Sequence, residues 1–213
     1  MAQTPSSRSV KISNDERGAW SSDRPRREGD GPPRPRDLTT RCRVLSPSDR
    51  MRYSPGSLVV IVSPSADLRD RFTERVFEEK GVVLSPQAVR KLIAGRVPDA
   101  ELDARAAAVL TATVAKRLDA GESVVVALDG LDAEERDPFV RAASELRRPR
   151  HLILLEAARD DVAEEDRALL NELRRAVDAG EVGSEGFQTA MRLGGGTIAE
   201  LKRIVFRPAP KDD

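Results

Sequence analysis

Hydrophobic residues follow two alternating patterns between residues 57 and 213. Short aliphatic runs, of which residues 58–62 are the most continuous, predict strands that are buried on both faces. Segments with apolar residues three or four positions apart predict helices that pack on those strands. We expect strands at 58–62, 82–84, 123–128, 151–155 and 204–206, and helices at 67–80, 86–93, 99–120, from about 132, 161–179 and 198–203.

The alternation of strands and helices indicates the fold class. Parallel strands need long crossover connections, which are usually helices, so this order favours a parallel sheet. The sequence therefore predicts an α/β domain over residues 57–213, with a mostly parallel sheet and helices on both faces. In open sheets of this kind, ligands bind at the carboxyl ends of the strands.

Residues 1–56 differ in composition from the rest of the chain. They hold 12 Lys and Arg against 7 Asp and Glu, together with seven of the 14 prolines, and show no apolar period. We interpret them as a disordered N-terminal tail, because such a segment buries too little apolar surface to offset its chain entropy. Two other interpretations stay open. The segment could be a basic arm that binds nucleic acid or an acidic partner, or the protein could naturally start at Met51, so that residues 1–50 are not part of it.

Composition excludes several classes of site. Cys42 is the only cysteine and His151 the only histidine, so the chain has no internal disulfide and no Cys/His zinc site. No nucleophile motif accompanies His151, which we expect to be structural or simply exposed. No apolar run is long enough to span a membrane, so we expect a cytoplasmic protein. The scarcity of aromatic residues, 3 % of the chain, disfavours a base-stacking surface.

The segment 63–70 joins the first strand to the first helix, where a phosphate-binding loop would lie. Such a loop needs glycines for its nest of N–H groups, a lysine for the outer phosphates and a hydroxyl for Mg²⁺. The corresponding residues here are Ser63, Leu68, Arg69 and Asp70, with Ser65 between them. Leu68 adds a Cβ where the backbone must approach the phosphate, and the carboxylates of Asp67 and Asp70 repel it. We therefore expect a degenerate Walker A loop and a helix capped by Asp67.

Three segments occur in the order found in a known family. They are VVIVSPSADLRDRF at 59–72, SPQAVR at 85–90 and VVALDGL at 125–131. With these segments the sequence resembles the P-loop kinases of the polynucleotide-kinase and zeta-toxin type, over about seven tenths of the chain. The resemblance implies a P-loop NTPase-like fold and a nucleotide site at the first loop.

The resemblance also implies roles for individual residues. Arg90 matches the arginine that helps to hold the acceptor or its phosphate. Asp129 follows an apolar strand, as a Mg²⁺-binding carboxylate does, and Arg159 lies where a lid supplies arginines to the phosphates. Gln87 and Ala127, however, stand where the family has aspartates, so the group that activates the acceptor hydroxyl is missing.

These observations favour a P-loop-kinase-like domain without phosphoryl transfer, which acts as a binding or regulatory module for an unidentified protein partner. The alternative is an active ATP-dependent kinase, of nucleotide or polynucleotide type, with a non-standard phosphate loop. In that case ATP and Mg²⁺ are its cofactors, Asp129, Arg90 and Arg159 are catalytic, and Asp129 holds the metal. Neither interpretation involves a membrane.

Overall fold

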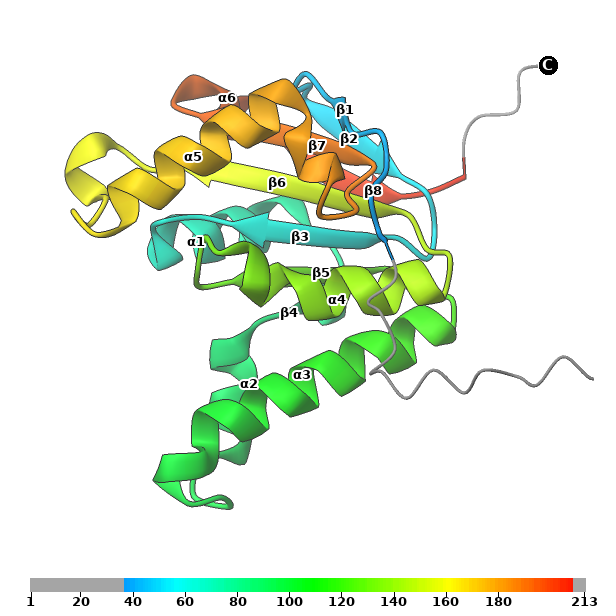
Figure 1. Ribbon diagram of the computed structural model, residues 1–213, viewed down its shortest axis with the longest axis vertical. Helices are drawn as coiled ribbons and strands as arrows, with labels where there is room; N and C mark the ends of the chain where they lie inside the picture. The colour runs from blue at the N-terminus through cyan, green and yellow to red at the C-terminus, as the bar shows by residue number, and fades with distance from the viewer. Residues whose placement is uncertain (1–36, 209–213) are drawn as a thin grey trace, which may run out of the picture. The chain divides into compact units, whose positions relative to one another are not determined.

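Strand β3 (Leu58–Val62) lies inside a six-stranded sheet in the computed structural model, which describes residues 37–208 (Figure 1). The strand order is β1 (Arg43–Val44), β7 (Thr189–Gly194), β6 (Arg150–Glu156), β3, β5 (Val124–Leu128) and β4 (Val83–Leu84). Every neighbouring pair in this sheet is parallel. The predicted α/β fold with a mostly parallel sheet is therefore confirmed.

Helices cover both faces of the sheet. The α-helices are α1 (Ala66–Val76), α2 (Pro86–Ile93), α3 (Leu102–Asp119), α4 (Ala133–Glu145), α5 (Asp166–Ala179) and α6 (Gly196–Glu200). Short 3-10 turns are η1 (Lys80–Val82), η2 (Asp99–Glu101), η3 (Arg159–Asp161) and η4 (Glu181–Gly183). Alternate side chains of β3 enter two cores, one shared with α3, α4 and α5 and the other with α1.

The predicted boundary of the N-terminal tail at residue 56 is wrong. Residues 37–56 belong to the folded unit: β1 extends the main sheet, and β2 (Arg50–Tyr53) pairs in parallel with β8 (Arg203–Phe206) in a small second sheet. Met51 and Tyr53 are buried against the core on the α1 side. Their alternation with arginines is a half-buried strand pattern, which the surrounding prolines and charges obscured. The rest of the predicted tail, residues 1–36, lies outside the described residues.

Truncation at Met51 is therefore expected to destabilise the domain. The carbonyl of Asp49 accepts hydrogen bonds from the N–H groups of Lys202 and Arg203, and Leu38 and Leu45 pack against the two cores. Loss of these contacts should cost about 2–4 kcal/mol, or roughly 5–12 °C in Tm, relative to a chain that starts at residue 37. Thermal unfolding of the two truncated chains measures the difference. Equal Tm values for the two chains would show that the domain needs none of the residues before Met51.

The hydrophobic pattern did not predict strand β7. Its sequence, Thr-Ala-Met-Arg-Leu-Gly, contains one charged and one helix-breaking residue and no long aliphatic run. Its position between β6 and β1 nevertheless buries Ala190, Met191 and Leu193. The short helix predicted at 198–203 also begins and ends earlier, as α6.

Candidate functional site

The connection from β3 to α1 is much shorter than the predicted phosphate loop. Only Ser63, Pro64 and Ser65 lie between the two elements, and the helix begins at residue 66. The Ser65 hydroxyl accepts a hydrogen bond from the N–H of Leu68 at 3.3 Å, and the Ser63 hydroxyl accepts one from the N–H of Ser65 at 3.2 Å. The predicted eight-residue loop and the Asp67 cap are thus wrong, because Ser65 already provides a favourable N-cap.

This connection is not built to bind an anion such as phosphate. A phosphate nest needs several successive N–H groups that curve around the ligand. In the β3–α1 connection the N–H groups of Ser65 and Leu68 are occupied by serine hydroxyls, and Pro64 has none. Leu68, Arg69 and Asp70 are helical residues, so their backbones do not curve around a ligand.

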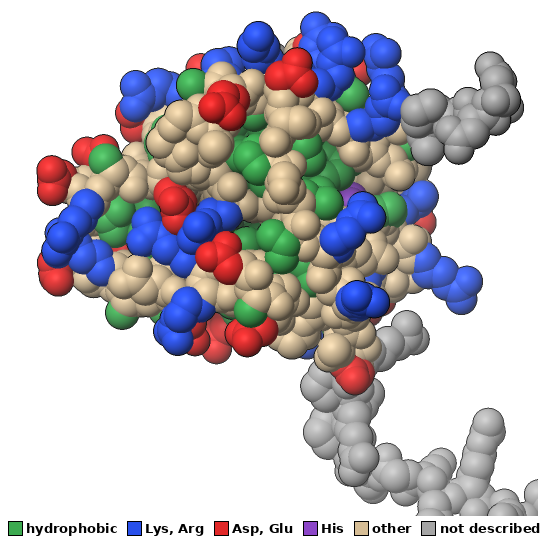
Figure 2. Space-filling view, turned by 90° about the horizontal axis from the view of Figure 1, so that it is seen from above, with side chains coloured by type: hydrophobic (Ala, Val, Ile, Leu, Met, Phe, Trp, Pro, Cys, Tyr) green, Lys and Arg blue, Asp and Glu red, His purple; other side chains and the backbone are tan. Residues whose placement is uncertain are grey.

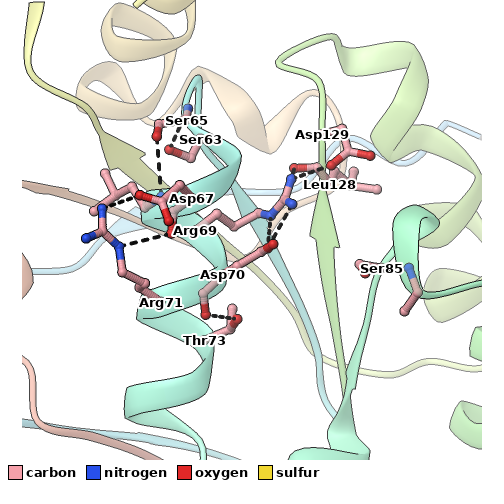
Figure 3. A network of polar contacts seen from close by, with 12 residues as sticks. Ser63, Ser65, Asp67, Arg69, Asp70, Arg71, Thr73, Ser85, Leu128 and Asp129 are labelled. Atoms are coloured by element: carbon pink, nitrogen blue, oxygen red, sulfur yellow. Dashed lines mark hydrogen bonds and ion pairs between the residues drawn. The ribbon is translucent and has the colours of Figure 1, made fainter. Parts of the chain in front are cut away.

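Arg69 lies at the centre of the polar contacts at the carboxyl ends of β3 and β5 (Figure 3). Its side chain is only 1 % exposed. Nη1 donates to the carbonyl of Leu128 at 2.6 Å and to Oδ1 of Asp129 at 2.7 Å. Nε and Nη2 donate to Oδ1 of Asp70 at 3.0 and 2.8 Å. Four of the five guanidinium N–H groups are thus used within the protein, and Arg69 ties α1 to β5.

The structure brings Asp129 and Arg90 together. Oδ2 of Asp129 lies 3.7 Å from Nη1 of Arg90, while Nε of Arg90 is 2.6 Å from Oδ1 of Asp103. Asp129 remains 41 % exposed, but each of its oxygens faces an arginine. Two neighbouring cations disfavour a divalent metal at this carboxylate. Within residues 37–208, no group of three or more His, Cys, Asp or Glu side chains is arranged to hold a metal ion.

Arg159 does not join this cluster. It lies in η3, after β6, and is exposed. With Arg167 and Arg174 it lines a separate cavity of about 330 Å³ against α5. Arg174 already donates to Glu156 at 2.6 Å, and Arg167 pairs with Glu164. The guanidiniums of this cavity are therefore largely neutralised by their own neighbours.

A larger cleft of about 840 Å³ lies at the carboxyl ends of β3, β6 and β7. Arg71 and Arg75 line this cleft from α1. The two arginines are four residues apart, which is the sequence signal that places them on the same side of a helix. Arg75 donates to the carbonyls of Ile198 and Leu201 at 2.5 and 2.8 Å and so anchors α6. Asp67, Glu156 and Asp161 also line the cleft, so its carboxylates outnumber its arginines.

His151 lies at the opposite, amino end of β6 and is 8 % exposed. Nδ1 is 2.8 Å from the hydroxyl of Thr189, Nε2 is 3.4 Å from that of Ser57, and the ring stacks on Tyr53 at 4.2 Å. Burial and the neighbouring Arg150 lower the pKa of His151 to about 4. Its packing identifies His151 as a structural residue.

The surface of residues 37–208 shows no single dominant charge on the face drawn in Figure 2, where basic and acidic side chains are interspersed around an apolar area. This face has no continuous basic stripe of the kind that nucleic acids require. The basic arm considered for nucleic acid lies mostly in residues 1–36, outside the described residues. Within the described part of the chain, no helix is long and apolar enough to cross a membrane.

Comparisons with known proteins give little beyond this geometry. No family model matches the sequence, and no curated protein matches it. Among solved structures, the chain is similar to the tunicamycin resistance protein of Deinococcus radiodurans, with 19 % identity and a TM-score of 0.34. The similarity covers 64 % of this chain and 85 % of the other. A likeness this distant carries no argument about function.

Proposed function

We infer that this chain is a P-loop-kinase-like domain that has lost phosphoryl transfer and serves as a binding or regulatory module. The observation that carries the proposal is the buried guanidinium of Arg69, which is committed to Asp70, Asp129 and the Leu128 carbonyl. A lysine in a phosphate loop must instead reach the outer phosphates. At the corresponding position of this chain, the Arg69 side chain instead holds α1 against the end of β5.

Other features support the loss of catalysis. The three-residue β3–α1 connection leaves no loop to enclose a phosphate. Asp129, the candidate Mg²⁺ ligand, is neutralised by two arginines. Gln87, on the first turn of α2, and Ala127, buried in β5, have no carboxylate that could accept a proton from an acceptor hydroxyl.

One observation favours the alternative, an active ATP-dependent kinase with a non-standard loop. The 840 Å³ cleft has the size of a nucleotide site, lies where open α/β sheets bind ligands and presents Arg71. Under this alternative, Arg71 contacts phosphate in the cleft, whereas Asp129, Arg90 and Arg159 lie outside its lining.

Thermal unfolding with 5 mM ATP or GTP and Mg²⁺ separates the two functions. A site with a Kd of about 50 μM would gain about 2.7 kcal/mol, or roughly 5–10 °C in Tm. We expect a shift below about 1 °C and no phosphate transfer or nucleotide hydrolysis. A larger, Mg²⁺-dependent shift that Arg71→Gln removes, and that Arg175→Gln on the exposed side of α5 leaves unchanged, would establish the kinase alternative.

A further inference from the structure

The small β2–β8 sheet has a strongly basic outer face. Alternate side chains of a strand point to opposite faces, and Met51, Tyr53 and Ile204 are buried against the core. The opposite face, which we call the arginine face, carries Arg50, Arg52, Arg203, Val205 and, just after β8, Arg207. In the register of the sheet, Arg50 lies directly opposite Arg203. Like charges in that position are destabilising, so this face favours an anionic partner.

One of these arginines is neutralised by a carboxylate within the described part of the chain. Nη2 of Arg203 lies 2.5 Å from Oε1 of Glu78. Arg50, Arg52 and Arg207 are exposed and make no ion pair with another residue of 37–208. Because guanidinium groups form paired hydrogen bonds with carboxylates and phosphates, the arginine face is suited to a ligand that carries such groups.

Strand β8 also has a free edge. The N–H of Arg207 donates to the carbonyl of Tyr53, on the β2 side. Since the backbone groups of successive residues point alternately to the two sides of a strand, those of Ile204 and Phe206 point away from β2. No residue of 37–208 is hydrogen-bonded to them on that side. The edge can therefore pair with one more strand, whose own N–H and C=O groups match the free ones.

A groove of about 550 Å³ lies beside this edge, at the amino ends of β4 and β5. It is lined by β8 and not by β2. Phe77 and Val82 also line it, and the ring of Phe77 stacks on that of Phe206 at 6.2 Å between centroids. The exposed carboxylates of Glu79 and Glu122 border the same groove. A side chain that enters the groove is therefore apolar rather than acidic.

We propose that the edge of β8 binds an extended acidic segment of a partner protein as an additional strand. The inference rests on the proposed function as a binding module and names the class of its partner. Successive side chains of the added strand point alternately to the arginine face and into the groove. Acidic residues thus belong beside Arg203 and Arg207, and apolar residues beside Ile204 and Phe206. A nucleic acid or a lipid surface can neutralise the arginines but has no strand backbone to pair with the free edge.

Fluorescence anisotropy of the peptide EVEVEV, labelled at its N-terminus, tests the proposal on the full chain. We expect saturable binding with a Kd on the order of 10–100 μM. The peptide EEEVVV has the same composition without the alternation, and KVKVKV has the alternation with the opposite charge. Both should bind at least about tenfold more weakly. The proposal is overturned if EVEVEV does not bind at about 500 μM protein, or if either control peptide binds equally well.

A charge reversal tests the arginine face. Arg207→Glu should raise the Kd of EVEVEV at least about tenfold, because it places a carboxylate beside the acidic positions of the peptide. Arg175→Glu, the same change at an exposed arginine of α5, is the matched control and should leave the Kd unchanged. An unchanged Kd for Arg207→Glu overturns the proposal. So does a chain that binds an oligonucleotide or phosphatidylserine vesicles through Arg207 and does not bind the peptide.

Two methylated peptides test the pairing of the backbones. Methyl groups on the Val amides of EVEVEV, or on its Glu amides, remove one alternate set of N–H groups each. Only one set faces β8, so one peptide should lose binding and the other should keep a Kd within about threefold of that of EVEVEV. Equal effects of the two methylation patterns overturn strand addition. The groove lies at the amino ends of the strands and the ATP cleft at their carboxyl ends, so a failure here leaves the proposed loss of phosphoryl transfer standing.

Discussion

Arg69→Lys should lower the free energy of unfolding by about 2–4 kcal/mol, although lysine is the residue that phosphate loops carry at this position. Lysine keeps the charge but cannot reproduce the four hydrogen bonds by which the buried guanidinium joins Asp70, Asp129 and the Leu128 carbonyl. Removing one member of a buried ionic network leaves its other members poorly paired, which is the costly case. Urea unfolding measures the loss.

Arg71→Lys is the matched control, two residues further along α1. The Arg71 side chain is 71 % exposed and pairs only with Asp67 on the helix surface. Its replacement should change stability by less than about 0.5 kcal/mol. If Arg69→Lys is as stable as the wild type and gains ATP binding, Arg69 occupies a working phosphate position and the proposed loss of function is wrong.

The fold was predictable because its central strands are continuous aliphatic runs. Strands β3 and β5 are covered on both faces, so nearly every position had to be apolar. The β1, β2 and β7 segments lack this property: β1 has two residues, β2 alternates with arginines and β7 contains Arg192. Their strand state is decided by neighbours that are remote in the sequence, which a local pattern does not reveal.

The candidate site was predictable only in part, for the same reason. The sequence placed Asp129 at the end of an apolar strand and matched Arg90 to an arginine of the family, but it did not predict that these two side chains lie 3.7 Å apart. The contact between Arg69 and Asp129 joins residues 60 positions apart. The sequence alone therefore showed Arg69 as a replaced lysine and gave no sign of its burial. Whether any of these residues acts on a ligand stays a prediction.

Titration of His151 should dominate the response of this domain to mild acid. Burial and the neighbouring Arg150 lower its pKa to about 4, whereas an unfolded histidine titrates near 6.5. Below pH 6.5 the unfolded chain therefore binds a proton that the folded chain does not. The contribution of His151 to the free energy of unfolding is fully present above pH 6.5 and is lost as the pH falls toward 4. The slope approaches 1.4 kcal/mol per pH unit, and the whole loss is about 3 kcal/mol.

Urea unfolding between pH 7.5 and 4.5 measures this loss, and His151→Gln isolates it from the titration of carboxylates. The variant loses the stacking on Tyr53 and is less stable at pH 7.5, but its stability should fall much less between pH 6.5 and 5. Because His151 is the only histidine, a single imidazole resonance reports its pKa directly by NMR. A folded-state pKa near 6.5, or equal pH slopes for the two proteins, would show that the proton enters without disturbing the contacts with Ser57 and Thr189. A value near 4 identifies those contacts as a neutral, acid-labile link between β6, β7 and the start of β3.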